Sequence, residues 1–187
     1  MAELTLYHAP GSRSDRVKAL LDLMKLPYQI VTIDLQAGDN KKPEYLAIHP
    51  LGKVPALKHG DRVLIESGAI MLYLADQFPA AKIAPPPQSP ERGRYYEWFI
   101  FALATVEPAA IAAMQNPDNA EAQATFKTLL GLVDARLGEP YALGDQLTAV
   151  DVLIHGQLQF MSQMGLLHDL PRATAYYLRH KNTIPAG

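Results

Sequence analysis

The residues best suited to binding chemistry lie between positions 54 and 67. Pro55 opens a short apolar run, and because proline cannot donate to a β-ladder, it belongs at the first residue or the edge of a strand. The backbone amide and carbonyl of Val54 are then left to pair with a ligand. A second run ends in Glu66-Ser67, where Ser67 can cap the next helix, whose first amides can hold a carboxylate. This arrangement suits a small peptide that carries a free carboxylate.

The composition of the chain excludes several other chemistries. None of its 187 residues is a cysteine, so disulfides, cysteine-ligated zinc and a protein thiol nucleophile are impossible. The net charge of −2 gives no basic field to attract nucleic acid or an anionic membrane. The six histidines show no metal-ligand spacing, and no phosphate loop or Ser-His-Asp pattern stands out. Without an apolar run of about 18 residues or a signal-like start, we expect a cytoplasmic protein with no metal and no membrane contact.

The first part of the chain predicts a small α/β domain over residues 1–78. Apolar and turn residues predict strands and helices in the order βαβ followed by ββα. The expected segments are a strand at 4–7, a helix through 17–24 that Pro27 ends, a strand at 28–33, a hairpin at 54–65 and a helix at 68–77. The binding residues Val54 and Glu66 then flank the hairpin.

The second part of the chain predicts an all-helical domain. Five prolines within residues 79–90 favour a stiff extended linker. Residues 91–187 then show only helical patterns, beginning with a long helix to about residue 114. Thr148 and Asp151 form a variant capping box, so we assign Asp151 a structural role and not a catalytic one.

The segment around Val54-Pro55 and Glu66-Ser67 resembles the glutathione-binding half of the soluble glutathione transferases. The resemblance is specific from about residue 4 to 76, and it implies a thioredoxin-like N-terminal domain followed by an all-α domain. It also implies that the Val54–Pro55 bond is cis, that the Val54 backbone pairs with the cysteinyl unit of glutathione, and that Glu66 and Ser67 hold the γ-glutamyl end. Lys53 would reach the glycyl carboxylate, and Arg13 could serve an anion.

The resemblance also implies that a hydroxyl stabilises the glutathione thiolate. A hydroxyl hydrogen bond contributes roughly 1.5–3 kcal/mol and a helix N-terminus ~0.3–1 kcal/mol, enough to lower a thiol pKa near ~8.5 by roughly one to three units. The spacing of Tyr7, Ser12 and Arg16 is similar to that of the bacterial-type, serine-using, theta-like branch. Ser12 is therefore the first candidate, and Ser14 and Tyr7 are the alternatives.

The expected function is a detoxifying transferase that conjugates glutathione to an apolar electrophile, with peroxide reduction as a second activity. The electrophile would bind between the domains against the long helix, near Tyr95, Trp98, Phe99 and Ala102. The resemblance implies a homodimer. Three alternatives remain: a non-catalytic scaffold that keeps the fold, a glutathione-dependent isomerase, and an ether-cleaving enzyme or dehalogenase. The isomerase is disfavoured by the residues 11–14, which depart from the Ser-Ser-Cys-Ser-like start of such relatives.

Overall fold

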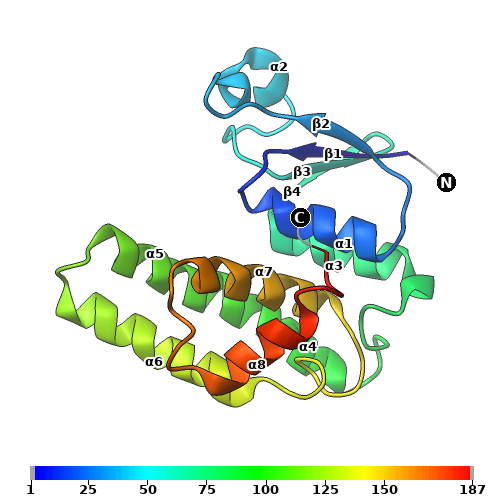
Figure 1. The fold of residues 1–187 in the computed structure, drawn as a ribbon. Helices are drawn as coiled ribbons and strands as arrows, with labels where there is room; N and C mark the ends of the chain where they lie inside the picture. Colours follow the sequence, from blue (N-terminus) through cyan, green and yellow to red (C-terminus); the bar gives the residue numbers. More distant parts are fainter. Residues whose placement is uncertain (1–2, 186–187) are drawn as a thin grey trace. The chain divides into compact units, whose positions relative to one another are not determined.

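The computed structural model describes residues 3–185, and the chain falls into two compact units (Figure 1). Among the described residues, the first unit contains residues 3–81 together with Ile184 and Pro185, and the second is Lys82–Thr183. The boundary between them lies inside the proline-rich segment 79–90. The division differs from a simple one at the linker, because Ile184 and Pro185 also belong to the first unit.

The first unit contains a four-stranded mixed sheet with the strand order β2-β1-β3-β4. Its strands are β1 (Leu4–His8), β2 (Gln29–Thr32), β3 (Ala56–His59) and β4 (Arg62–Ile65). β1 pairs with β2 in parallel and with β3 antiparallel, and β3 and β4 form the hairpin. The thioredoxin-like order that was expected is therefore confirmed.

Helices α1 (Ser14–Leu23) and α3 (Ser67–Gln77) pack against each other and lie on the same side of this sheet (Figure 1). Their apolar side chains bury a core with those of β1 and β3, including Leu6, Val17, Leu20, Leu57, Ile70 and Leu74. Two short helices in the β2–β3 connection were not predicted, namely η1 (Asp39–Lys41) and α2 (Pro43–Leu46). A third, η2 (Pro79–Ala81), follows α3.

The second unit is helical, as expected. It comprises α4 (Glu91–Ile100), a π-helical segment (Phe101–Val106), α5 (Glu107–Gln115), α6 (Ala120–Arg136), α7 (Ala149–Gln163) and α8 (Pro171–His180). The long helix predicted from residue 91 is present, but it widens to π geometry just before Pro108. Proline lacks the amide hydrogen and its ring clashes with the carbonyl four residues earlier, here that of Ala104, so a local widening is the expected response.

By length and composition alone, the continuous helix Glu91–Gln115 could also cross a membrane. This is weak support for insertion, because core helices of soluble proteins pass the same test. In this structure α4 contacts α7, and α5 contacts α6.

The capping box at the start of α7 forms as predicted. The backbone amide of Thr148 donates to Asp151 Oδ2 at 2.7 Å, and the reciprocal bond from the Asp151 backbone to the Thr148 side chain is also present. The buried Asp151 carboxylate further accepts the Ala142 amide at 2.7 Å and the Tyr176 hydroxyl at 2.5 Å. It ties α7 to α8 and to the preceding loop, which fits the structural role assigned to it.

Candidate functional site

Two serine side chains are in hydrogen-bond contact at the start of α1. The Ser12 Oγ lies 2.7 Å from the Ser14 Oγ, donates to the Ala9 carbonyl at 2.6 Å and accepts the Ser14 amide at 3.1 Å. Ser14 is 0% exposed, whereas Ser12 is only partly buried. A ligand from solvent can therefore approach the Ser12 hydroxyl, whereas the Ser14 hydroxyl is enclosed by protein groups.

A buried imidazole completes this group. Nδ1 of His8 lies 2.8 Å from the Ser14 Oγ and 3.9 Å from the Asp15 Oδ1. Burial lowers the pKa of His8, against the raising effect of Asp15, and burial raises the pKa of the Asp15 carboxyl. Because Ser14 and Asp15 approach the same ring nitrogen, the group is not a Ser-His-Asp relay, in which serine and carboxylate use opposite nitrogens.

Tyr7 lies on the other face of the sheet. Side chains alternate along a strand, and in β1 the buried residues are Leu4, Leu6 and His8, while Tyr7 is half-buried. The Tyr7 ring packs 5.8 Å from that of Tyr45, measured between centroids. The structure therefore brings Ser12 and Ser14 together and directs Tyr7 away from them.

The loop before β3 is held in a conformation that requires glycine at position 52. Gly52 has φ = +59°, and a Cβ there would lie 2.5 Å from the backbone oxygen of Asn40. The Gly52 carbonyl accepts the Asn40 side-chain amide at 2.7 Å, and the Gly52 amide donates to the His49 carbonyl at 2.8 Å. The Tyr45 hydroxyl donates to the Lys53 carbonyl at 2.6 Å, and burial raises the pKa of Tyr45 to about 12.

Val54 presents an unpaired backbone at the end of this loop. The Val54–Pro55 bond is cis, as the resemblance implied. Among the hydrogen bonds of residues 3–185, none involves the backbone of Val54. Its amide and carbonyl are therefore available to a ligand, and the neighbouring Lys53 side chain is exposed.

The start of α3 offers unused amides beside a strained residue. Glu66 has φ = +70°, a region that residues other than glycine rarely occupy and that often marks functional positions. It is the N-cap of α3, and no side chain caps the helix. The prediction that Ser67 is the cap is wrong, because Ser67 is already the first helical residue. The first amides of α3 consequently lack a side-chain partner and suit a carboxylate.

The strand register brings these three features to one end of the sheet. Tyr7 of β1 is paired with Ala56 of β3, and Ala56 is paired with Ile65 of β4. The loop to Ser12 follows β1, Val54 precedes β3 and Glu66 follows β4. Hydroxyls, open backbone and uncapped amides therefore converge within the first unit. Arg13, the exposed N-cap residue of α1, belongs to the same end.

The four residues predicted to line an electrophile pocket are instead core residues of the second unit. Each is at most 1% exposed: Tyr95, Trp98, Phe99 and Ala102. Tyr95, Trp98 and Phe99 lie on the buried face of α4, and Ala102 lies in the π-helical segment that follows it. The prediction failed because helical spacing identifies an apolar face without showing whether that face is covered. The other face of α4 carries Ile100, which is 64% exposed.

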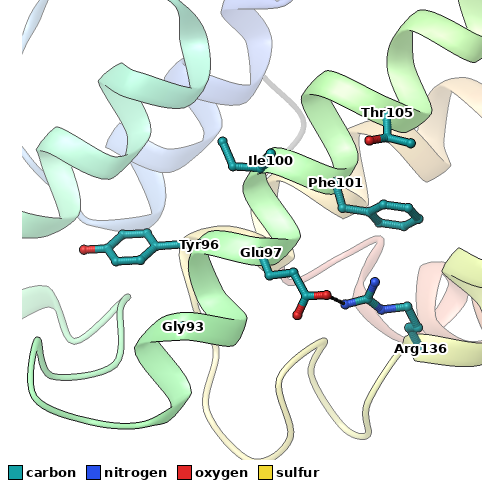
Figure 2. A pocket seen from close by; sticks show the side chains of 7 residues that line it. All are labelled: Gly93, Tyr96, Glu97, Ile100, Phe101, Thr105 and Arg136. Atoms are coloured by element: carbon teal, nitrogen blue, oxygen red, sulfur yellow. Dashed lines mark hydrogen bonds and ion pairs between the residues drawn. The ribbon is translucent and has the colours of Figure 1, made fainter.

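This exposed face borders an open pocket of about 480 Å³. Figure 2 shows Ile100, Phe101 and Thr105 along the helix, with the Glu97 carboxylate joined to the Arg136 guanidinium of α6. The pocket is lined by Gly93, Tyr96, Glu97, Ile100, Phe101, Thr105 and Arg136. In the part of the chain that the structure describes, no three His, Asp or Glu side chains are placed to hold a metal ion.

The chain matches known proteins along its length. Residues 2–76 match the glutathione S-transferase N-terminal domain. A maize protein, glutathione S-transferase 3, is 44% identical over 79 residues, which span 42% of this chain and only 36% of that protein. Glutathione S-transferase 1 of Dianthus caryophyllus is 30% identical over 76% of this chain and 70% of its own length.

The structural comparison agrees with the sequence comparison. The crystal structure of a glutathione transferase homologue from Sulfitobacter, with bound glutathione, superposes with a TM-score of 0.80 at 26% identity, over 97% of this chain and 93% of that one. This structural match covers both units, and the sequence match to the Dianthus relative covers 76% of the chain. The chain therefore belongs to the glutathione S-transferases, a family of transferase enzymes.

Proposed function

We propose that this chain binds glutathione in its first unit and conjugates it to an apolar electrophile: the thiolate sulfur forms a bond to the electrophile, and a leaving group such as the chloride of a chloronitrobenzene departs. The observation that carries the proposal is the unpaired Val54 backbone, which lies at the same end of the sheet as the uncapped start of α3. The Sulfitobacter homologue was solved with glutathione bound, which supports glutathione as the ligand here.

Each part of glutathione has a matching feature. The cysteinyl backbone pairs with the amide and carbonyl of Val54, the residue before the cis bond to Pro55. The γ-glutamyl carboxylate accepts the first amides of α3, next to Glu66 and Ser67. The glycyl carboxylate lies toward Lys53, and Lys41 adds a second cation, since its Nζ would be 3.5 Å from a Cβ at Gly52.

Ser12 is the hydroxyl that stabilises the thiolate in this proposal. It is partly exposed at the N-terminus of α1, where its proton and the helix amides both favour an anion. Ser14 is enclosed, and Tyr7 is directed to the other face of the sheet. The thiol proton leaves to solvent, so no general base is required.

Substitution of Ser12 by alanine tests this assignment. We expect the pKa of the bound thiol to rise by about one to two units, because a hydrogen bond to a charged group is worth roughly 1.5–3 kcal/mol. Turnover of a chloronitrobenzene at neutral pH should fall by about one to two powers of ten. Calorimetry should show nearly unchanged glutathione affinity, and Tyr7→Phe is the matched control that should retain turnover.

Two outcomes would change the proposal. Unchanged turnover and thiol pKa in Ser12→Ala, with loss in Tyr7→Phe, would transfer the role to Tyr7. Absence of glutathione binding at millimolar concentration would favour the scaffold interpretation, in which the fold is kept without activity.

We further propose that the protein is a cytoplasmic homodimer and that the exposed face of α4 contributes to the dimer. This face carries Tyr96 and Ile100, both large and exposed, around the open pocket of Figure 2. Exposed apolar patches of this kind often mark protein interfaces. Peroxide reduction would use the same thiolate and remains part of the proposed activity.

A further inference from the structure

The proposed glutathione site leaves the buried His8 without a role. It is 5% exposed and its Nδ1 lies 2.8 Å from the Ser14 Oγ. The backbone of His8 is held by the sheet, since His8 pairs with Thr32 in β2 and its carbonyl accepts the Ile33 amide at 2.8 Å. The imidazole is therefore held one serine away from the candidate hydroxyl.

The hydrogen-bonding capacity of Ser14 links His8 to Ser12. A serine hydroxyl has one proton to donate and two lone pairs to accept with. Besides His8, the Ser14 Oγ has as neighbours the Ala9 amide at 3.0 Å, the Ala9 carbonyl at 3.0 Å and the Ser12 Oγ at 2.7 Å. The Ala9 amide can only donate, so it always occupies one lone pair.

The second lone pair depends on where His8 carries its proton. With the proton on Nδ1, His8 donates to Ser14 and fills that lone pair, so Ser12 cannot donate to Ser14. The Ser12 proton is then directed to the Ala9 carbonyl or to a ligand. With a bare Nδ1, His8 accepts the Ser14 proton, and Ser14 can take the Ser12 proton away from the ligand.

We propose that His8, with its proton on Nδ1, is a positioning residue that directs the Ser12 hydroxyl toward the sulfur of bound glutathione. In this arrangement His8 donates to Ser14, Ser14 donates to Ser12 and Ser12 donates to the thiolate. Aligned hydrogen bonds of this kind strengthen one another. No proton is transferred along this series of hydrogen bonds. This inference rests on the proposed function, because it requires glutathione at Ser12.

The charged groups around His8 favour the same arrangement. Asp15 and Lys18 of α1 act on the imidazole with opposite signs. The Asp15 carboxylate, 3.9 Å from Nδ1, favours a proton on that nitrogen, while burial disfavours a second proton and a positive ring. A neutral imidazole protonated at Nδ1 satisfies both conditions.

Two substitutions at His8 separate positioning from packing. His8→Leu removes the ring nitrogens and fills the space, whereas His8→Asn can place an amide donor where Nδ1 was. Three quantities are measured: the pKa of the thiol of bound glutathione, from the ultraviolet absorbance of the thiolate; the Kd of glutathione, by calorimetry; and the pH profile of kcat/KM. Thermal melts followed by circular dichroism establish that each variant is folded.

We expect His8→Leu to raise the bound thiol pKa by about one unit, so that kcat/KM falls about tenfold at neutral pH and approaches the unsubstituted value at high pH. The Kd of glutathione should change by less than about threefold, since the affected bond is specific to the ionised sulfur. His8→Asn should restore most of the loss. In the Ser14→Ala background, His8→Leu should have little further effect, because His8 acts through Ser14.

Nitrogen-15 NMR of the free protein adds a measurement that does not need glutathione. It should show the His8 proton on Nδ1, and a proton on Nε2 alone would overturn the inference. An unshifted thiol pKa in folded His8→Leu, or equal losses in His8→Leu and His8→Asn, would overturn it as well. Failure of the unsubstituted protein to bind glutathione would instead refute the proposed function itself, and calorimetry detects that before any variant is made.

Discussion

Substitution of Gly52 by alanine tests how far the loop before β3 determines the binding of glutathione. Gly52 has φ = +59°, and an added Cβ would lie 2.5 Å from the backbone oxygen of Asn40. Positive φ alone costs a residue with a side chain roughly 1–2 kcal/mol. The overlap adds to this, because the obstructing atom is backbone and the loop must move to relieve it.

Gly38→Ala provides the matched control for the backbone term. Gly38 has φ = +77°, and nothing lies within 4 Å of its ideal Cβ. It should therefore lose only the roughly 1–2 kcal/mol of free energy of unfolding that the conformation costs. Gly52→Ala should lose more, up to about 3 kcal/mol, in urea unfolding followed by circular dichroism.

The effect on binding follows from the position of the loop. Relief of the overlap displaces Gly52 from Asn40, and the change passes to Lys53 and Val54, which are the next two residues. If the two hydrogen bonds from Val54 to glutathione are lost, at about 0.5–1.5 kcal/mol each, the Kd should rise by about 5- to 150-fold. Gly38→Ala should leave the Kd within about twofold.

Equal stability of the two variants would refute the reasoning about the overlap. A Gly52→Ala variant that is destabilised but binds glutathione normally would refute the link between this loop and the ligand. Urea unfolding tests the first outcome, and calorimetry with glutathione, performed on both variants at the same temperature and pH, tests the second.

Two further predictions concern the second unit. Burial, with a smaller effect of His180, lowers the pKa of His155 from 6.5. As the pH falls, the unfolded chain therefore takes up a proton at this histidine before the folded chain does. The free energy of unfolding should be highest above pH about 6.5 and decrease below it. The urea midpoint should decrease less between pH 7.5 and 5.5 in His155→Phe than in the unsubstituted protein. Ile100→Glu should convert the proposed dimer to a monomer, as measured by light scattering, because it would bury a charge in the interface. The control Leu178→Glu, at a similarly exposed site on α8, should remain dimeric. A dimer that persists in Ile100→Glu would show that this face is not part of the interface.

The residues that we propose to bind glutathione carry local signals in the sequence. A proline at the start of a strand and an acid-hydroxyl pair at the start of a helix are chemical features of short segments, and Val54, Pro55 and Glu66 lie where these features placed them. The capping box of Asp151 is local in the same way. The π-helical segment, by contrast, depends on how the helix responds to Pro108, which the long apolar pattern did not reveal.

The electrophile residues could not be predicted because periodicity alone does not distinguish a core from a pocket. Tyr95, Trp98 and Phe99 share a helical face, and that pattern is equally typical of a buried seam and a ligand wall. Only the packing of α7 against α4 decides between them. The exposed residues Tyr96 and Ile100 lie between the predicted positions in sequence, and they were not singled out in the sequence analysis.

The choice among the hydroxyls depended on the last residue of β1. The predicted strand ended at Tyr7, and a tyrosine at a strand end can turn in either direction. In the structure β1 continues to His8, which is paired with Thr32. Because successive side chains of a strand face opposite sides, Tyr7 is directed toward Tyr45 and His8 toward Ser14. The alternation that directs Tyr7 away from Ser12 and Ser14 therefore directs the imidazole of His8 toward them, and His8 is the one residue by which β1 is longer than predicted.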